Sequence, residues 1–152
     1  MPEIKGKKIL VIGGAGFIGS HVVDNLLKED VSQVTIYDNF VRGTADNIEE
    51  ALKDPRARVF EVGGDILQTD ILSAAMKESD MVIHLAALWL LQCHDYPRSA
   101  FEVNIRGTFN VLEACRDNKI ERLVYSSSAS VYGDAVEIPM TEEHPFNNRT
   151  FY

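Results

Sequence analysis

Three glycines spaced three residues apart, Gly13, Gly16 and Gly19, follow a short apolar run and precede a segment with helical periodicity. Glycines at such a junction allow a tight turn, let a phosphate approach the backbone and let the helix pack close to the strand. The first turn of the helix presents unpaired N–H groups and the positive end of its dipole to an anion. The same spacing also occurs in plain strand-to-helix turns, so the glycines alone do not identify a ligand.

A carboxylate after the next strand supplies a second signal. Asp38 ends that predicted strand, nineteen residues after Gly19, where its side chain can accept hydrogen bonds from both hydroxyls of an adenosine ribose. The glycines and Asp38 together predict a dinucleotide site. A mononucleotide P-loop is disfavoured because Ser20 stands at its lysine position. Asp38 favours NAD over NADP, since a 2′-phosphate would meet like charge, although Arg42 nearby could pair with a phosphate.

The elements that must position these residues alternate along the chain. Apolar runs typical of buried strands are followed by segments with helical spacing of apolar side chains. The predicted strands are 7–14, 34–38, 57–65, 80–87 and 121–128, and the predicted helices are 17–30, 45–53, 69–79 (with Thr69 or Asp70 near its N-cap) and 96–118. This alternation predicts the α/β class, with a Rossmann-type doubly wound parallel sheet covered by helices on both faces.

The domain organisation expected from this pattern has two parts. Residues 1–132 form an NAD-binding Rossmann domain, and residues 133–152, which contain two prolines and no apolar period, form an active-site loop. That loop runs into the start of a catalytic tyrosine helix. The fold is expected to be C-terminally incomplete, with the later strands and the substrate domain absent.

Composition excludes several classes of function. The net charge of −8 disfavours nucleic acid as a partner, because phosphate backbones require basic patches. No apolar run approaches the ~20 residues of a membrane helix, so we expect a cytoplasmic protein without a membrane partner. Cys93 and Cys115 form no CxxC motif, and the four histidines lack zinc spacing, so we expect no metal.

Further motifs follow the glycine loop in a fixed order. They are Asp38-Asn39, Gly64-Asp65-Ile66, His84-Leu85-Ala86-Ala87, Asn104-Ile105-Arg106-Gly107-Thr108 and Ser126-Ser127-Ser128-Ala129-Ser130-Val131-Tyr132-Gly133. In them the chain closely resembles the extended short-chain dehydrogenase/reductases, the NAD-dependent epimerase/dehydratase family, and within it the UDP-sugar 4-epimerases. The resemblance implies an enzyme with NAD as cofactor, a nucleotide-sugar substrate of the UDP-sugar type and 4-epimerisation by hydride abstraction and return. It is also compatible with a homodimer of the full-length protein.

The resemblance assigns a role to each matching residue. It implies that the pyrophosphate binds to Gly13, Gly16, Phe17, Ile18 and Gly19, and the adenosine ribose to Asp38 and Asn39. Asp65 and Ile66 would flank the adenine, and Leu85, Ala86 and Ala87 would line the channel under the pyrophosphate and the nicotinamide ribose. Asn104 would support the wall of the active site, and Ser126 would face the nicotinamide. Two alternatives remain from the residues alone. Asp65 also fits a turn after a strand, and Asn104 also fits a polar position on a helix surface.

The resemblance implies two catalytic residues. Ser128 would donate a hydrogen bond to the reacting sugar hydroxyl, although a serine in this polar run also fits a turn. Tyr152, twenty-four residues later, would be the base of a Tyr-x-x-x-Lys motif whose lysine would be residue 156. A tyrosine hydroxyl has an ordinary pKa near 10, and the family lowers it with the lysine and nicotinamide charges. We therefore expect the 152-residue chain alone to be inactive.

Other functions stay open at this point. Sugar dehydratases carry an Asp-Glu pair after the catalytic Ser or Thr, and Ala129-Ser130 after Ser128 counts against dehydration. Reductases, decarboxylases and uronate epimerases of the same family remain possible. A non-catalytic dinucleotide-binding module would follow if the natural chain ended at Tyr152. The apolar segment 88–91 fits core, an oligomer contact or a substrate entrance.

Overall fold

The five strands form one parallel sheet in a computed structural model that describes residues 4–150 and 152. The strands are β1 (Lys8–Ile12), β2 (Gln33–Tyr37), β3 (Ala57–Val59), β4 (Met81–His84) and β5 (Arg122–Tyr125). Their order, β3-β2-β1-β4-β5, confirms the predicted doubly wound sheet. The register pairs Ile12 with Tyr37 on one side and with His84 on the other. The carboxyl ends of the central strands therefore meet at one edge, where the glycine loop begins.

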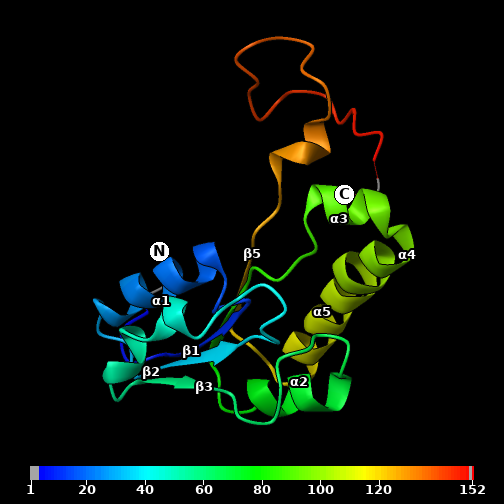
Figure 1. Cartoon of the computed structure of the whole chain (residues 1–152). Helices are drawn as coiled ribbons and strands as arrows, with labels where there is room; N and C mark the ends of the chain where they lie inside the picture. Colours follow the sequence, from blue (N-terminus) through cyan, green and yellow to red (C-terminus); the bar gives the residue numbers. More distant parts are fainter. Residues whose placement is uncertain (1–3, 151) are drawn as a thin grey trace.

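Helices cover both faces of the sheet (Figure 1). One face carries α1 (Phe17–Leu27) and two short 3₁₀ turns, and the other carries α2 (Thr69–Met76) and α5 (Thr108–Asp117). Alternate residues of β1 belong to opposite cores: Ile9 and Val11 pack on the α1 side, and Leu10 and Ile12 on the side of α2 and α5. This burial on both faces explains the continuous apolar run in the sequence.

The α-helix predicted over residues 45–53 does not form. The structure has two 3₁₀ turns instead, η1 (Asp46–Ile48) and η2 (Ala51–Lys53). The buried side chains here are Ile48 and Ala51, three residues apart, which matches the three-residue turn of a 3₁₀ helix. Asn47 also donates from its side chain to the carbonyl of Ala15, which fixes this segment to the glycine loop at the expense of helical continuity.

The long helix predicted over 96–118 is nearly right in extent but not in regularity. It runs as α4 (Pro97–Ala100), a π-helical segment η3 (Phe101–Gly107) and α5. A separate short helix, α3 (Leu90–Asp95), precedes it and was not predicted. A Cβ on Gly107 would lie 2.5 Å from the Cδ1 atom of Ile66, so the helix passes very close to the loop after β3.

One smaller prediction also needs correction. β3 ends at Val59 rather than at Gly63-Gly64, because the chain turns away to form the loop that closes one end of the site. The N-cap of α2 is Gln68, which makes no capping hydrogen bond with its side chain, and Thr69 and Asp70 follow it directly, as predicted. After β5 comes a 3₁₀ turn, η4 (Ala129–Tyr132), and the described residues beyond it contain no helix or strand. That last segment stands away from the sheet (Figure 1).

Candidate functional site

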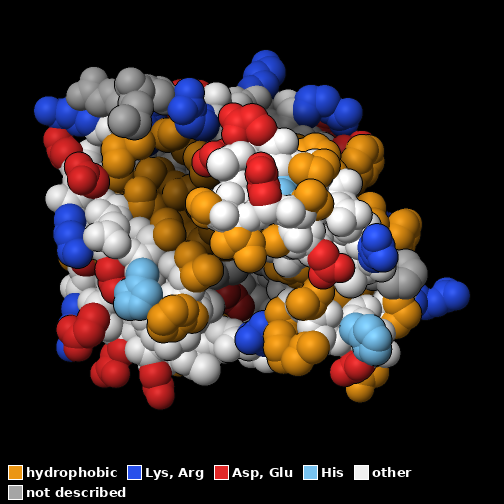
Figure 2. Space-filling view, turned by 90° about the horizontal axis from the view of Figure 1, so that it is seen from above, with side chains coloured by type: hydrophobic (Ala, Val, Ile, Leu, Met, Phe, Trp, Pro, Cys, Tyr) orange, Lys and Arg blue, Asp and Glu red, His pale blue; other side chains and the backbone are white. Residues whose placement is uncertain are grey.

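A cavity of about 600 Å³ lies at the carboxyl edge of the sheet, within the size range of small-molecule sites. The face shown in Figure 2 is hollowed near its middle. All but three of the predicted site residues line this cavity: Gly13, Gly16, Phe17, Ile18, Gly19, Asp38, Asn39, Asp65, Ile66, Leu85, Ala86, Ala87 and Ser126 do, whereas Asn104, Ser128 and Tyr152 do not. The loops after β1, β2, β3 and β4 therefore converge on one site.

The three glycines of the loop are needed for different reasons. Gly13 has a φ of +82°, and a Cβ there would lie 2.8 Å from the backbone nitrogen of Ala86. A Cβ on Gly19 would lie 2.0 Å from the carbonyl oxygen of Gly13, so α1 packs against the turn at that point. A Cβ on Gly16 would meet nothing closer than 3.4 Å, which means that its absence keeps space open rather than preventing a clash.

Asp38 is oriented by backbone groups on both sides. Its Oδ2 accepts a hydrogen bond from the N–H of Ala15 in the glycine loop, and its Oδ1 accepts one from the N–H of Phe40, both at 2.9 Å. Each carboxylate oxygen keeps a second lone pair, so two further donors can bind. A Cβ on Gly64 would lie 2.0 Å from the carbonyl oxygen of Asp38, so the loop after β3 also presses on this residue. The geometry suits recognition of a diol.

The far wall of the cavity is built by hydrogen bonds to backbone carbonyls. The hydroxyl of Tyr37 donates to the carbonyl of Asp65 at 2.9 Å, and burial raises the pKa of this hydroxyl, which keeps it a donor. The buried side chain of Asn110 donates to the carbonyl of Ile66. Asp65 itself forms a turn, since its Oδ1 accepts from the N–H of Leu67. Asp65 therefore serves as a turn residue and as part of the cavity wall.

Asn104 lies behind the cavity rather than in it. Its Oδ1 accepts from the N–H of Leu88 at 2.7 Å, and its Nδ2 donates to the carbonyl of Leu88 and to the Sγ atom of Cys93. These contacts come from the π-helical segment and hold the chain after β4. Asn104 is therefore not a solvated polar residue on a helix surface, and its position suits support of the wall.

The two residues expected to be catalytic lie beyond the cavity. The Oγ of Ser128 caps η4 by accepting a hydrogen bond from the N–H of Ser130 at 3.1 Å, which leaves its own proton free to donate. Ser126, two residues earlier, lines the cavity. The backbone N–H of Tyr152 donates to Oγ1 of Thr150. Among the described residues, no hydrogen bond joins Ser128 to Tyr152.

Several residues that line the cavity were not among the predicted site residues, although Gly64 lies in one of the motifs, Arg42 was noted as able to pair with a phosphate and Leu88 belongs to the apolar segment 88–91. They are Val41, Arg42, Gly43, Asn47, Gly64, Leu67, Leu88, Gln92, Ser99 and Val103. Gly43 and Gly64 carried a usable signal, because glycines that follow strands often mark close backbone contacts. Asn47 and Gln92 had none, since polar residues at helical positions are usually solvated. Within residues 4–150 and 152, no cluster of His, Cys, Asp and Glu could hold a metal, and no helix is long and apolar enough to span a membrane.

A parallel sheet of order 3-2-1-4-5, with a glycine loop after its central strand and an acid after the next, defines the class of Rossmann-type dinucleotide-binding folds. Comparisons with known proteins narrow this class. The model of the 3-beta hydroxysteroid dehydrogenase/isomerase family matches residues 10–151. UDP-glucose 4-epimerase of Lactobacillus helveticus is 36% identical over 143 residues, which cover 92% of this chain and 41% of that protein. The human 3 beta-hydroxysteroid dehydrogenase type 7 is 37% identical over 90% of this chain and 35% of that protein.

Solved structures agree with the sequence relatives. A UDP-glucose 4-epimerase from Stenotrophomonas maltophila, with bound NAD and a formylated UDP-arabinopyranose, superposes with a TM-score of 0.86 at 32% identity, over 96% of this chain and 44% of that one. The chain therefore belongs to the extended short-chain dehydrogenase/reductases, the family of NAD-dependent epimerases and dehydratases. It spans about two fifths of the length of the curated relatives it matches.

Proposed function

We propose that this chain is the NAD-binding portion of a nucleotide-sugar 4-epimerase. The observation that carries the proposal is the continuity of the cavity, which runs from Asp38 past the glycine loop to Ser126. A dinucleotide bound along it would place its ribose at one end and its reacting ring beside the strand end that leads to Ser128. The UDP-glucose 4-epimerases among the relatives support a UDP-sugar as substrate.

The residues of the cavity fit NAD. Gly16 leaves room for a phosphate at the N-terminus of α1, and the backbone N–H groups of Phe17 and Ile18 lie in the first turn of that helix. Asp38 has two free lone pairs for the ribose hydroxyls, and its charge disfavours a 2′-phosphate, so NAD is preferred to NADP. When bound, NAD supplies an acceptor for hydride from the sugar and a donor for its return.

Two side chains of this protein would assist removal of the proton from the sugar hydroxyl. Ser128 keeps its hydroxyl proton and can donate a hydrogen bond, without transferring the proton, to the oxygen on C4 of the sugar. Tyr152 would act as the base that removes the proton from that hydroxyl, with a pKa lowered by positive charge close to it. Neither residue lines the cavity, although Ser126, two residues before Ser128, does.

A second reaction deserves a direct test. The match to the hydroxysteroid dehydrogenase family supports a net oxidation, in which hydride leaves with the cofactor instead of returning to the substrate. Both reactions need the same cavity, serine and tyrosine, so the two differ only in the fate of the hydride. Dehydration is disfavoured, because Ala129 and Ser130 stand where that reaction needs an acid pair.

The experiment follows the hydride. The natural gene product, its length established by intact mass, is incubated with NAD and UDP-galactose deuterated at C4. An epimerase gives UDP-glucose that retains the deuterium at C4, whereas a dehydrogenase transfers the deuterium to reduced NAD and gives no epimer. Tyr152→Phe should abolish either activity while NAD affinity stays unchanged. Deuterium in accumulated reduced NAD, or no conversion with any UDP-sugar, would contradict the epimerase.

A further inference from the structure

The cavity contains one basic side chain among the described residues that line it, and that side chain is Arg42. Two acids, Asp38 and Asp65, line the same cavity. A pyrophosphate carries two negative charges at neutral pH, and the glycine loop offers it only backbone dipoles. Arg42 is thus the one full positive charge that the described lining residues bring to a phosphorylated ligand.

The backbone around Arg42 is fastened to the glycine loop. A Cβ on Gly43 would lie 2.8 Å from the carbonyl carbon of Ala15, and the N–H of Thr44 donates to the carbonyl oxygen of Ala15 at 3.2 Å. Asn47 donates to the same oxygen at 2.8 Å. Because Ala15 lies between the first two glycines of the motif, these contacts place Arg42 beside the loop that receives the phosphates.

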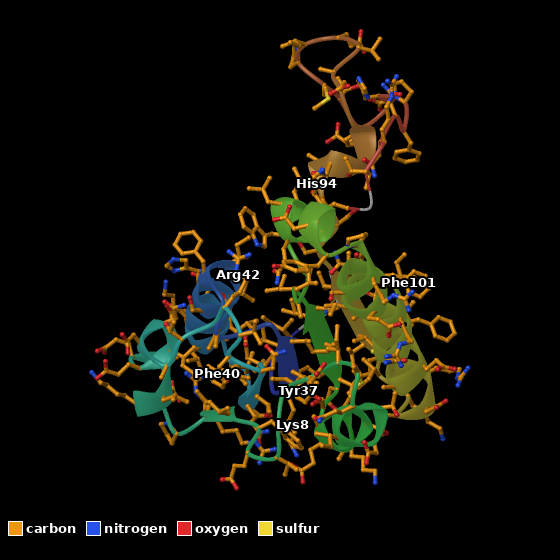
Figure 3. The ribbon with its side chains drawn as sticks, turned by 45° about the vertical axis from the view of Figure 1, so that its right-hand side comes forward. Lys8, Tyr37, Phe40, Arg42, His94 and Phe101 are labelled. Carbon is orange, nitrogen blue, oxygen red and sulfur yellow. The ribbon has the colours of Figure 1, made fainter. Side chains whose placement is uncertain are left out.

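The guanidinium of Arg42 is held by an aromatic ring rather than by an acid. Its Cζ atom lies 5.2 Å from the centroid of the Trp89 ring, within the range of a cation–π contact. No ion pair among residues 4–150 and 152 involves Arg42. Figure 3 shows Arg42 above the sheet, between α1 and α3. The ring orients the cation without neutralising its charge, so the charge stays available to an anion.

Trp89 is itself positioned by the opposite wall. It follows Leu88, whose N–H and carbonyl are both bonded by Asn104. The contact between Arg42 and Trp89 therefore joins the loop after β2 to the loop after β4, the two walls on either side of the glycine loop. An arginine side chain that is already oriented in the free protein loses less conformational entropy when the ligand binds, so binding is tighter.

We propose that Arg42, oriented by Trp89, binds the pyrophosphate of the dinucleotide and so positions it along the glycine loop. This inference rests on the proposed function, since it requires that the cavity bind NAD. Arg42 is a positioning residue in this scheme, with no part in the proton or hydride steps. A hydrogen bond from a charged donor to phosphate corresponds to an affinity change of about tenfold to a hundredfold.

The test compares ligands with and without phosphates. The full chain and its Arg42→Gln variant are titrated by calorimetry with NAD, ADP and adenosine. Arg42→Gln should weaken NAD and ADP by about tenfold to a hundredfold and leave adenosine within about twofold. The matched control is Arg122→Gln, which removes the same charge from an exposed position at the start of β5. That control should change none of the three affinities.

Trp89 variants test the orienting role. Trp89→Leu should weaken ADP by about twofold to fivefold, the range of an exposed cation–π contact, and Trp89→Phe should restore most of that loss. Trp89 is the only tryptophan, so its fluorescence reports this contact directly. ADP should change the emission in the native chain and not in Arg42→Gln.

Two results would overturn the inference, and they are distinguishable. If the native chain binds NAD but Arg42→Gln binds NAD and ADP equally well, or loses adenosine to the same degree, the role of Arg42 is refuted while the cofactor site stands. If the native chain binds neither NAD nor ADP, the proposed function fails and the inference fails with it.

Discussion

Alanine substitutions in the glycine loop should separate binding from folding. At Gly16 the backbone has φ −72° and ψ 173°, which alanine adopts without strain, and the new Cβ would meet nothing closer than 3.4 Å. Alanine at this N-cap position is about 1 kcal/mol less favourable than glycine. Alanine also reduces the conformational entropy of the unfolded chain, which stabilises the folded state by about 0.4–1 kcal/mol. Because these two effects nearly cancel, the free energy of unfolding should stay within about 0.5 kcal/mol of the native value.

Under the proposed function, the same methyl group would stand where the phosphate of NAD approaches α1. Loss of a hydrogen bond to the charged phosphate corresponds to about 1.5–3 kcal/mol, or about tenfold to a hundredfold in the dissociation constant of NAD. Gly19→Ala should behave in the opposite way. Its Cβ would lie 2.0 Å from the carbonyl oxygen of Gly13, so α1 must move, at a cost of about 1–3 kcal/mol.

The assay pairs urea unfolding with calorimetric titration of NAD for the native chain and both variants. The expected pattern is a stable Gly16→Ala variant that binds NAD weakly and a destabilised Gly19→Ala variant. The reasoning is refuted if Gly16→Ala unfolds as easily as Gly19→Ala, or if it binds NAD with native affinity. The first result would mean that a methyl group at Gly16 disturbs the fold, and the second that the phosphate does not bind over Gly16.

Three further predictions concern the supports of the site. Burial lowers the pKa of His84 to about 4, below the value near 6.5 in the unfolded chain, so the unfolded chain takes up the proton first as the pH falls. The free energy of unfolding, measured with urea, should therefore fall by about 2 kcal/mol from pH 7 to pH 5. Asn104→Ala removes the acceptor for the N–H of half-buried Leu88 and leaves its carbonyl only the weak thiol donor of Cys93, so it should destabilise the chain by about 1–3 kcal/mol while weakening NAD. Arg56→Lys should lower the midpoint of urea unfolding, because the guanidinium donates to the carbonyl of Leu27 at the end of α1 and to that of Val31 in the loop after it.

Each of these three has a control. The pH dependence attributed to His84 should flatten in His84→Gln, and an unchanged slope would assign it to another group. Asn104→Asp keeps the acceptor for the N–H of Leu88 but sets a carboxylate oxygen against its carbonyl, so it should also destabilise the chain, and native stability in Asn104→Asp would contradict the hydrogen-bond argument. Arg56→Lys should leave NAD affinity unchanged, because Arg56 lies outside the residues that line the cavity.

Much of the fold and of the cavity lining could be predicted from the sequence, because the signals are local. The run from Ile9 to Ile12 is apolar because both faces of β1 are buried, and the alternation of strands and helices predicts a parallel sheet. Gly13 and Gly19 mark backbone contacts that no side chain could share. Such constraints act on single residues, so they are visible without knowledge of their partners.

The missed features depend on contacts between distant segments. The 3₁₀ turns replace a predicted helix because Asn47 bonds to Ala15, and the π-helical segment aims Asn104 at Leu88. No local pattern reports such partners, since propensity and periodicity describe only neighbours along the chain.

By itself, the sequence determined the class of the sheet, the position of the glycine turn and the acid that follows the second strand, because each of these depends on residue type and local spacing. Only the tertiary structure decided which side chains share the cavity. Arg42 and Trp89 are 47 positions apart, and they meet because Ala15 holds one loop and Asn104 holds the other. Spacing along the chain fixes backbone conformation, whereas proximity in space requires the packed sheet.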